Sequence, residues 1–281
     1  MIAIIGGTGT LGSEVVKQLV ATGIKPRVLV RSSEKALKLT GVEPVLGDSS
    51  DRAAVDKLLA GASKLFLLLP SLPGSVESAA TLISAAKRAG VKHVVRLSVL
   101  GADLNSQVQL ARWHAETERN LKASGLAWTM LQPGSFAQNL LRSAATIRKD
   151  GVFYGASGDA KVCAIDARDI AAVAVKCLTT EGHQGKSYPL TGQEPLSQAE
   201  VAAKLGAALG KKVTYVDLPL DTFRQALVSA GVPGWLAADF ATMNAWFAAG
   251  GAAKPDPRLP TLIGKVRTFD DFLAAYVAAF K

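Results

Sequence analysis

A glycine-rich turn close to the N-terminus constrains this chain more than any other feature of its sequence. Gly6, Gly9 and Gly12 directly follow an apolar run at residues 2–5 and open an amphipathic stretch that ends at Gly23. Glycine can adopt positive φ, and its missing side chain lets the backbone approach another group closely. The order of strand, glycine turn and helix is typical of the first βαβ unit of a dinucleotide-binding sheet, where free amides at the helix start face a pyrophosphate. The turn therefore predicts an anion site.

Short β-rich runs alternate with amphipathic stretches through the first half of the chain. This alternation predicts an α/β fold built on a Rossmann-type doubly wound parallel sheet. The predicted strands of this sheet are residues 2–5, 27–30, 44–46, 64–69, 93–98 and 127–131, and the fifth helix is residues 107–123.

The alternation becomes irregular after residue 131. Here we expect a strand and helix within 162–178, a strand at 187–190, a helix at 198–209, a strand at 212–217 and a helical tract at 222–247 interrupted at 231–234. We therefore expect an NAD(P)-binding Rossmann domain at residues 1–150. A smaller C-terminal α/β substrate lobe is expected at residues 151–281, with elements that partly return to the Rossmann sheet.

Composition and charge exclude several other classes of protein. No apolar run reaches the roughly 20 residues of a membrane-spanning helix, and no basic segment precedes the apolar N-terminus, so no membrane partner and a cytoplasmic location are expected. Cys163 and Cys177 have no metal-type spacing, so no metal site is predicted. The net charge of +9 comes from scattered Lys and Arg, which gives no reason to expect a nucleic-acid partner. We expect a monomer or a homodimer.

Arg31 predicts which dinucleotide the chain prefers. Sites for NAD place an acidic residue at the end of the second strand, where it binds the adenosine ribose, and here that place holds Arg31. A guanidinium can pair with the 2′-phosphate of NADP, and Ser32, Ser33 and Lys35 could add contacts. The expected cofactor is therefore NADPH, with NADH the less favoured one; the alternative is that Arg31 is only a solvated loop residue.

Further candidate residues lie at or just after the ends of three predicted strands. The carboxyl ends of parallel strands form the edge of the sheet that faces the ligand. Asp48 follows the third strand, Leu69 and Pro70 end the fourth, and Ser98 ends the fifth. Asp48 could contact the adenine or could cap the helix that follows it, and the sequence leaves these two interpretations open.

The sequence lacks the Tyr-xxx-Lys pair with which short-chain dehydrogenases transfer protons. Its four tyrosines, at positions 154, 188, 215 and 276, are followed four residues later by Gly, Gly, Pro and Phe. Ordinary alcohol dehydrogenation is therefore disfavoured. Hydride delivery to a conjugated acceptor such as a quinone stays possible, because its reduced form can take a proton from water.

The sequence resembles the NmrA-like, atypical branch of the short-chain dehydrogenases, most closely the type 2 NAD(P)H:quinone oxidoreductases and the triphenylmethane-dye reductases. The likeness covers nearly the whole chain. The segments that carry it are residues 6–12, 30–31, 47–48, 89–93, 114–118, 124–126, 129–134, 182–183, 186–190 and 230–233.

The resemblance implies a set of site residues. A cofactor would be lined by Gly6, Thr8, Gly9, Thr10, Leu11, Arg31, Leu69 and Pro70, together with Gly12 and Asp48 from the arguments above. Ser98, Pro133, Phe136 and Asn139 would lie near the nicotinamide or the acceptor. Apart from the resemblance, Trp113 could stack on a flat acceptor or could be a core residue. His114 stands where the superfamily has its lysine.

His114 and Ser98 are thus the candidate catalytic residues. His114 could orient the nicotinamide ribose or a water molecule, or could be a histidine packed near Trp113. We expect an NADPH-dependent oxidoreductase that reduces a quinone or a similar conjugated acceptor. The alternative is a non-catalytic sensor of NADP(H), as NmrA itself resembles a dehydrogenase without being an active one.

Overall fold

A seven-stranded sheet has the strand order β3-β2-β1-β4-β5-β6-β8, and all of its strands except β8 come from the first half of the chain. It is seen in a computed structural model that describes all of residues 1–281. Adjacent pairs from β3 to β6 are parallel. The strands are β1 Ile2–Ile5, β2 Arg27–Val30, β3 Glu43–Leu46, β4 Lys64–Leu67, β5 His93–Leu97, β6 Ala127–Pro133 and β8 Lys186–Leu190. The strand order reverses between β1 and β4, so a ligand crevice is expected outside the carboxyl ends of these two strands.

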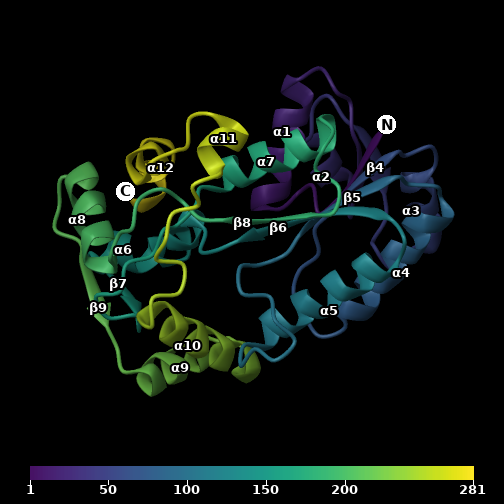
Figure 1. Cartoon of the computed structure of the whole chain (residues 1–281). Coiled ribbons are helices and arrows are strands. Elements are labelled where there is room, and N and C mark those ends of the chain that lie inside the picture. The colour runs from purple at the N-terminus through teal and green to yellow at the C-terminus, as the bar shows by residue number, and fades with distance from the viewer. The chain divides into compact units, whose positions relative to one another are not determined.

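Helices cover both faces of this sheet (Figure 1). They are α1 Thr10–Ala21, α2 Ser33–Leu37, α3 Arg52–Leu59, α4 Ser75–Arg88, α5 Gln109–Ala123 and α7 Ala167–Thr179. In Figure 1, α1 and α7 lie on one side of the sheet, and α3, α4 and α5 lie on the other. The first pair is joined by a hydrogen bond from Gln18 Nε2 to the carbonyl of Arg168 at 2.9 Å.

The core between the sheet and the helices α3, α4 and α5 consists of aliphatic side chains. Leu58, Leu65 and Leu121 are fully buried in this cluster, as is Val94 of β5. The central strands read as nearly continuous apolar runs because both of their faces are covered. The buried Arg96 of β5 interrupts that pattern.

The chain divides into two compact units. Unit 1 comprises residues 1–106, 110–133 and 167–189, and unit 2 comprises residues 107–109, 134–166 and 190–281. The boundary predicted at residue 150 therefore falls within unit 2, and α7, from the predicted C-terminal lobe, belongs to unit 1 with the Rossmann sheet.

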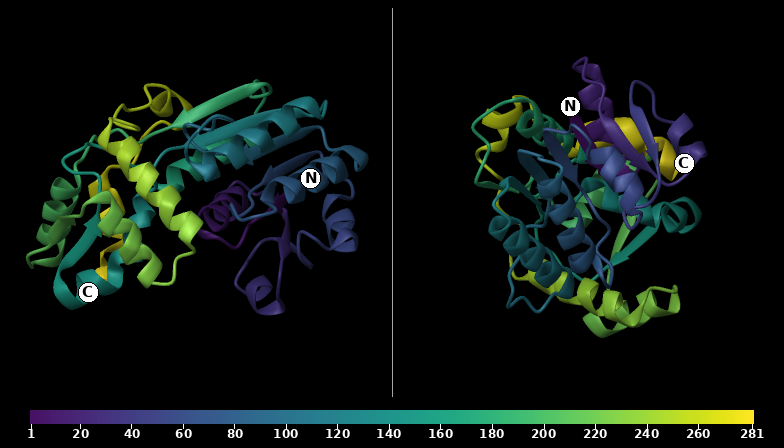
Figure 2. Two further views of the ribbon diagram at one scale, coloured as in Figure 1. Left: turned by 90° about the horizontal axis from the view of Figure 1, so that it is seen from below. Right: turned by 90° about the vertical axis from the view of Figure 1, so that its right-hand side faces the viewer.

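Unit 2 is built around a two-stranded parallel sheet of β7 Val152–Gly155 and β9 Thr214–Asp217. Its helices are η1 Ala137–Ser143, α6 Ala144–Asp150, α8 Gln198–Leu209, α9 Leu220–Ser229, α10 Gly234–Ala248, α11 Leu259–Ile263, α12 Phe269–Tyr276 and η2 Val277–Phe280. The pair α9 and α10 lies side by side in every view (Figures 1 and 2). Phe272 and Phe280 are fully buried in the core of this unit.

The predicted α/β class and the Rossmann-type sheet are confirmed. The helix predicted at 198–209 has those bounds. The interruption predicted at 231–234 is found at residues 230–233, between α9 and α10. The strand expected near Val162 is wrong, because this segment forms only isolated bridges, Val162 to Leu196 and Ile165 to Phe136. No helix of the structure has the length and apolarity required to cross a bilayer.

Candidate active site

The glycine turn lies at the point where the strand order reverses. Gly6 follows β1, and Leu68 follows the neighbouring strand β4. The Leu68 amide donates to the Ile5 carbonyl at 3.2 Å, which holds the two strand ends together. Both segments therefore border the crevice that a doubly wound sheet offers to a dinucleotide.

Close packing requires two of the glycines in the turn. Gly6 has a φ of +86°, and a Cβ there would lie 2.5 Å from the Leu68 carbonyl oxygen. A Cβ on Gly12 would lie 2.0 Å from the carbonyl oxygen of Gly6. Real Cβ atoms do not approach so closely, so these positions exclude any side chain.

Gly9 is different, because neither its backbone nor its neighbours require glycine. Its φ of −83° and ψ of 175° are open to any residue, and a Cβ would meet only the Gly6 carbonyl oxygen, at an ordinary 3.7 Å. Gly9 is exposed at the start of α1, where no side chain caps the helix and no acidic residue stands in the first turn. Gly9 is the N-cap residue of α1, next to first-turn amides that no side chain caps, and a helix start of this kind can bind a pyrophosphate.

The predicted contacts around the turn have different exposures. Thr8 is half-buried and Thr10 is exposed, so both could present polar groups to a ligand. The side chain of Leu11 is buried, 3% exposed, so only its backbone amide is available to a phosphate. Leu69 is half-buried and Pro70 exposed in the segment after β4.

Arg31 and Asp48 lie at the carboxyl ends of β2 and β3. Both side chains are exposed. The backbone amide and the hydroxyl of Ser50 each donate to Asp48 Oδ1 at 3.0 Å. These two bonds hold the pKa of Asp48 below its usual value, and the bond from the backbone amide has the larger effect. The positive charge of Arg31 lowers the pKa further.

Asp48 does not cap the helix that follows it. The cap of α3 is Asp51, whose Oδ1 accepts from the Ala54 amide at 3.2 Å. The capping alternative for Asp48 is therefore wrong, and the adenine contact stays a prediction. Arg31 is followed by Ser32, which caps α2 by accepting from the Lys35 amide at 3.3 Å.

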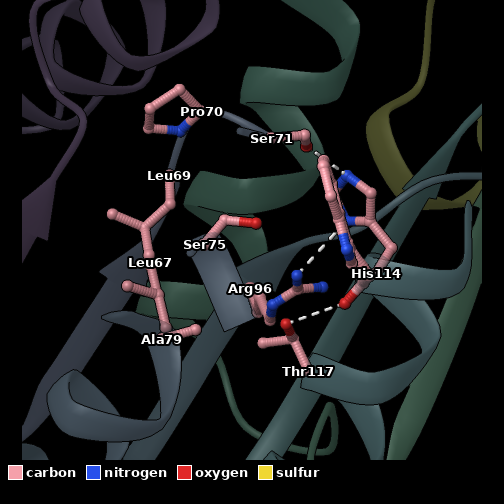
Figure 3. A pocket seen from close by; sticks show the side chains of 10 residues that line it. Leu67, Leu69, Pro70, Ser71, Ser75, Ala79, Arg96, His114 and Thr117 are labelled. Carbon is pink, nitrogen blue, oxygen red and sulfur yellow. Dashed lines mark hydrogen bonds between the residues drawn. The ribbon is translucent and has the colours of Figure 1, made fainter. Parts of the chain in front are cut away.

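A small pocket opens beside the carboxyl ends of β4 and β5, between the sheet and the helices α4 and α5 (Figure 3). Its lining residues are Leu67, Leu69, Pro70, Ser71, Ser75, Ala79, Arg96, Trp113, His114 and Thr117. Its interior volume of about 20 Å³ is close to that of one water molecule. The predicted residues Leu69, Pro70, Trp113 and His114 are thus brought together here.

His114 is the centre of a hydrogen-bonded chain in this pocket. Its Nδ1 lies 3.2 Å from Arg96 Nη2, and its Nε2 lies 2.9 Å from Ser71 Oγ. Figure 3 shows the Arg96 guanidinium turned toward the imidazole ring, with Ser71 on the far side of the ring. The side chain is 8% exposed and lines the pocket together with Trp113, as the packed alternative expects, and both ring nitrogens also have polar partners. An orienting role of His114 toward a ribose or a water molecule stays a prediction.

His114 is uncharged at neutral pH. Burial lowers the pKa of the imidazole to about 3, and the positive charge of Arg96 adds to that shift. Burial also lowers the pKa of Arg96 to about 10, while the nearby carboxylate of Glu118 opposes the change. Arg96 therefore carries the positive charge of this pair, and His114 has no second proton to give to a substrate.

Comparison with known proteins decides the family. The sequence profile described as the NmrA-like family matches residues 1–273. The chain belongs to the NmrA-like family.

Its relatives in this family include several named reductases. The chain is 44% identical to the NAD(P)H azoreductase of Xenophilus azovorans over 100% of its own length and 99% of the relative's. Among solved structures, the NADPH-dependent quinone oxidoreductase of Escherichia coli in complex with NADPH is similar with a TM-score of 0.88 and 36% identity, covering 98% of this chain and 99% of that one. The triphenylmethane reductase of Citrobacter sp. in complex with NADP(H) has a TM-score of 0.85 and 29% identity, over 98% and 99%.

The other predicted residues of this NmrA-like chain lie in both units. Ser98 is fully buried after β5, and its Oγ has no hydrogen-bond partner. Pro133 ends β6 in unit 1 and accepts from the Leu100 amide at 2.8 Å. Phe136 and Asn139 belong to unit 2, where the Asn139 amide donates to the Phe136 carbonyl at 3.0 Å.

Arg96 and Ser71 are the site residues that sequence reasoning did not single out. A charged residue in the middle of the apolar strand 93–97 was a usable signal, because an unpaired Arg is almost never fully buried. Ser71 carried no such signal, since its hydroxyl is one of several in a Pro- and Ser-containing loop. Only the fold shows that His114 of α5 reaches it.

The other two histidines serve the opposite end of the sheet. His93 Nε2 lies 2.8 Å from Thr129 Oγ1, which donates to the His183 carbonyl at 2.6 Å. His183 Nδ1 lies 2.8 Å from the Tyr188 hydroxyl. These contacts join β5, β6 and β8 within unit 1, and they give the two histidines structural roles.

Proposed function

We propose that this chain is an NADPH-dependent reductase that passes hydride to a quinone, an azo dye or a similar conjugated acceptor. The observation that carries the proposal is Gly9: a glycine that packing does not require stands beside the free amides of α1, at the reversal of the strand order. A ligand that approaches the backbone there explains the missing side chain. The names of the related azoreductase and quinone oxidoreductase supply the acceptor class.

The residues of the turn would bind the pyrophosphate. The amides of Thr10, Leu11 and Gly12 form the first turn of α1, where the helix dipole favours a negative charge. The exposed guanidinium of Arg31, at the end of β2, would pair with the 2′-phosphate of the adenosine half, and Asp48 would lie beside the adenine. The nicotinamide half would then extend toward β4 and β5, along Leu69 and Pro70.

A bound nicotinamide would supply the hydride, and the protein would contribute orientation and exclusion of water. No side-chain acid is assigned to the transfer. His114 is neutral and engages both ring nitrogens, so we propose that it orients its neighbours and moves no proton. An acceptor whose reduced form takes its proton from water suits such a site.

The sensor alternative predicts a different outcome from the reductase. Three relatives that are 36% to 44% identical to this chain have names that state a reductase or oxidoreductase activity, which supports turnover over sensing. The test is NADPH oxidation, followed by its near-ultraviolet absorbance, with a panel of quinones and azo dyes and with the Gly9→Ala variant as a control for adventitious reduction. Acceptor-dependent oxidation by the wild type alone is expected. NADPH binding without oxidation by any acceptor would favour the sensor.

A further inference from the structure

The chain Arg96–His114–Ser71 leaves only one arrangement of protons. A guanidinium only donates, so the contact with Arg96 Nη2 makes His114 Nδ1 an acceptor. The ring proton of neutral His114 must then sit on Nε2, which donates to Ser71 Oγ at 2.9 Å. The Ser71 hydroxyl accepts this bond, and its own proton has no acceptor in the protein.

Stability does not explain why Arg96 is buried here. The side chain is 7% exposed, forms no ion pair and leaves Nη1 without a partner. The nearby Glu118 is engaged by Lys122 Nζ at 3.2 Å and by Gln132 Nε2 at 2.7 Å. A buried charge without its own counter-ion costs stability, and such costs are typical of functional sites.

Ser71 stands where one half of a dinucleotide would pass. It follows β4 by four residues, and Leu68 of the same segment packs against Gly6 of the glycine turn. In a doubly wound sheet the β1–β2 side takes the adenosine half, with Arg31 at its end, and the β4–β5 side takes the other half. The Ser71 hydroxyl is therefore close to the nicotinamide half rather than to the adenine.

We propose that Arg96 and Ser71 are positioning residues for the nicotinamide half of the cofactor. Arg96 fixes the tautomer of His114, His114 fixes the Ser71 hydroxyl, and the Ser71 proton is thereby directed at an oxygen of the nicotinamide ribose or carboxamide. This inference rests on the proposed function, since it requires a dinucleotide in the crevice. It differs from a direct role of Arg96, because Arg96 acts only through its two neighbours.

A double-mutant cycle on NADPH binding tests this coupling. Ser71→Ala is expected to weaken NADPH binding roughly threefold to tenfold, the effect of one hydrogen bond, and Ser71→Thr to restore it. Arg96→Met is expected to cause a similar loss in the wild type and almost none in the Ser71→Ala background. Ser78→Ala, which removes the α4 hydroxyl that bonds the Gly74 carbonyl, is the control and should bind as the wild type does.

Several outcomes would overturn the inference. Losses that add in the double variant would mean that Arg96 acts independently of Ser71. Unchanged binding in Ser71→Ala, with the wild type binding normally, would mean that the hydroxyl contacts no cofactor. If the wild-type protein binds no NADPH, the proposed function itself is refuted. The titration of the wild type is done first, so this result is distinguished from a failure of the present inference.

Nitrogen NMR of His114 gives a readout that needs neither cofactor nor activity. The wild type is expected to show the neutral Nε2–H tautomer at neutral pH, with Nδ1 unprotonated. Arg96→Met removes the donor to Nδ1, so the resonances should change toward a mixture of tautomers, and Arg96→Lys should preserve the wild-type pattern. A wild-type spectrum with the proton on Nδ1 would refute the proposed chain even if NADPH binds and is oxidised.

Discussion

The carbonyl oxygen of Gly6 lies 2.0 Å from the place where a Cβ on Gly12 would stand. Gly12 is thus a packing requirement, whereas Gly9 in the same turn has an ordinary 3.7 Å to the same oxygen. The two glycines should therefore respond differently to the same substitution. A substitution at Gly12 should affect the stability of the fold, and one at Gly9 should affect ligand binding.

Gly12→Ala is expected to lower the free energy of unfolding by about 3 kcal/mol, because a methyl group collides with backbone. Gly9→Ala is expected to cost less than about 1 kcal/mol and to weaken NADPH binding at least tenfold, because its methyl group lies over the helix amides. Urea denaturation and calorimetric titration measure the two effects. A Gly9→Ala protein that binds NADPH like the wild type would remove the main support for the cofactor site.

Arg31→Glu tests the preference for NADPH. A lost charge-assisted contact with the 2′-phosphate is expected to weaken NADPH binding by about 1.5 to 3 kcal/mol and to affect NADH less. The matched control for net charge is Lys25→Glu, because Lys25 is exposed and precedes the amino end of β2. Equal losses for both dinucleotides, or equal effects of the two substitutions, would reject the assignment of Arg31.

Asp48 and Asp51 offer a second matched pair, three residues apart. Asp51→Ala removes the cap of α3 and is expected to lower the free energy of unfolding by about 1 kcal/mol. Asp48→Ala removes bonds within an exposed turn and should change it by less than about 0.5 kcal/mol. Denaturation in urea checks both values; a larger effect at Asp48 would contradict the capping assignment.

Local pattern predicted the elements that carry clear signals in their own sequence, and it missed a short strand that carries few. The helix 198–209 begins with a capping box formed by Ser197 and Glu200 and ends at Gly210, which is in the left-handed region. Both features are recognisable in the sequence. The strand β7 has only four residues, which include the exposed Tyr154 and end at Gly155, so its own sequence shows no clear strand pattern.

The same distinction applies to the candidate site. The glycine turn and Arg31 were predicted because their roles follow from their order along one βαβ unit. Ser71, Arg96 and His114 come from a loop, a strand and a helix, and their hydrogen bonds exist only after the sheet has formed. No spacing rule relates residues brought together in that way.

His93 predicts an acid-sensitive fold. Burial lowers the pKa of this imidazole to about 4 from an ordinary value near 6.5, and the charge of Lys64 adds to the shift. The unfolded chain therefore binds a proton more readily than the folded one, so stability is present above pH 6.5 and is lost as the pH falls toward 4. Between pH 7 and pH 5 this one group should lower the free energy of unfolding by about 2 kcal/mol.

His93→Gln isolates that contribution, because its amide nitrogen can still donate to Thr129 Oγ1 but cannot titrate. His114 and His183 also have lowered pKa values and stay in both proteins, so only the difference between variant and wild type belongs to His93. Urea denaturation at pH 7 and pH 5 should show a smaller loss in the variant by about 2 kcal/mol. Equal losses would mean that His93 stays charged or solvated in the folded protein, against its 2% exposure.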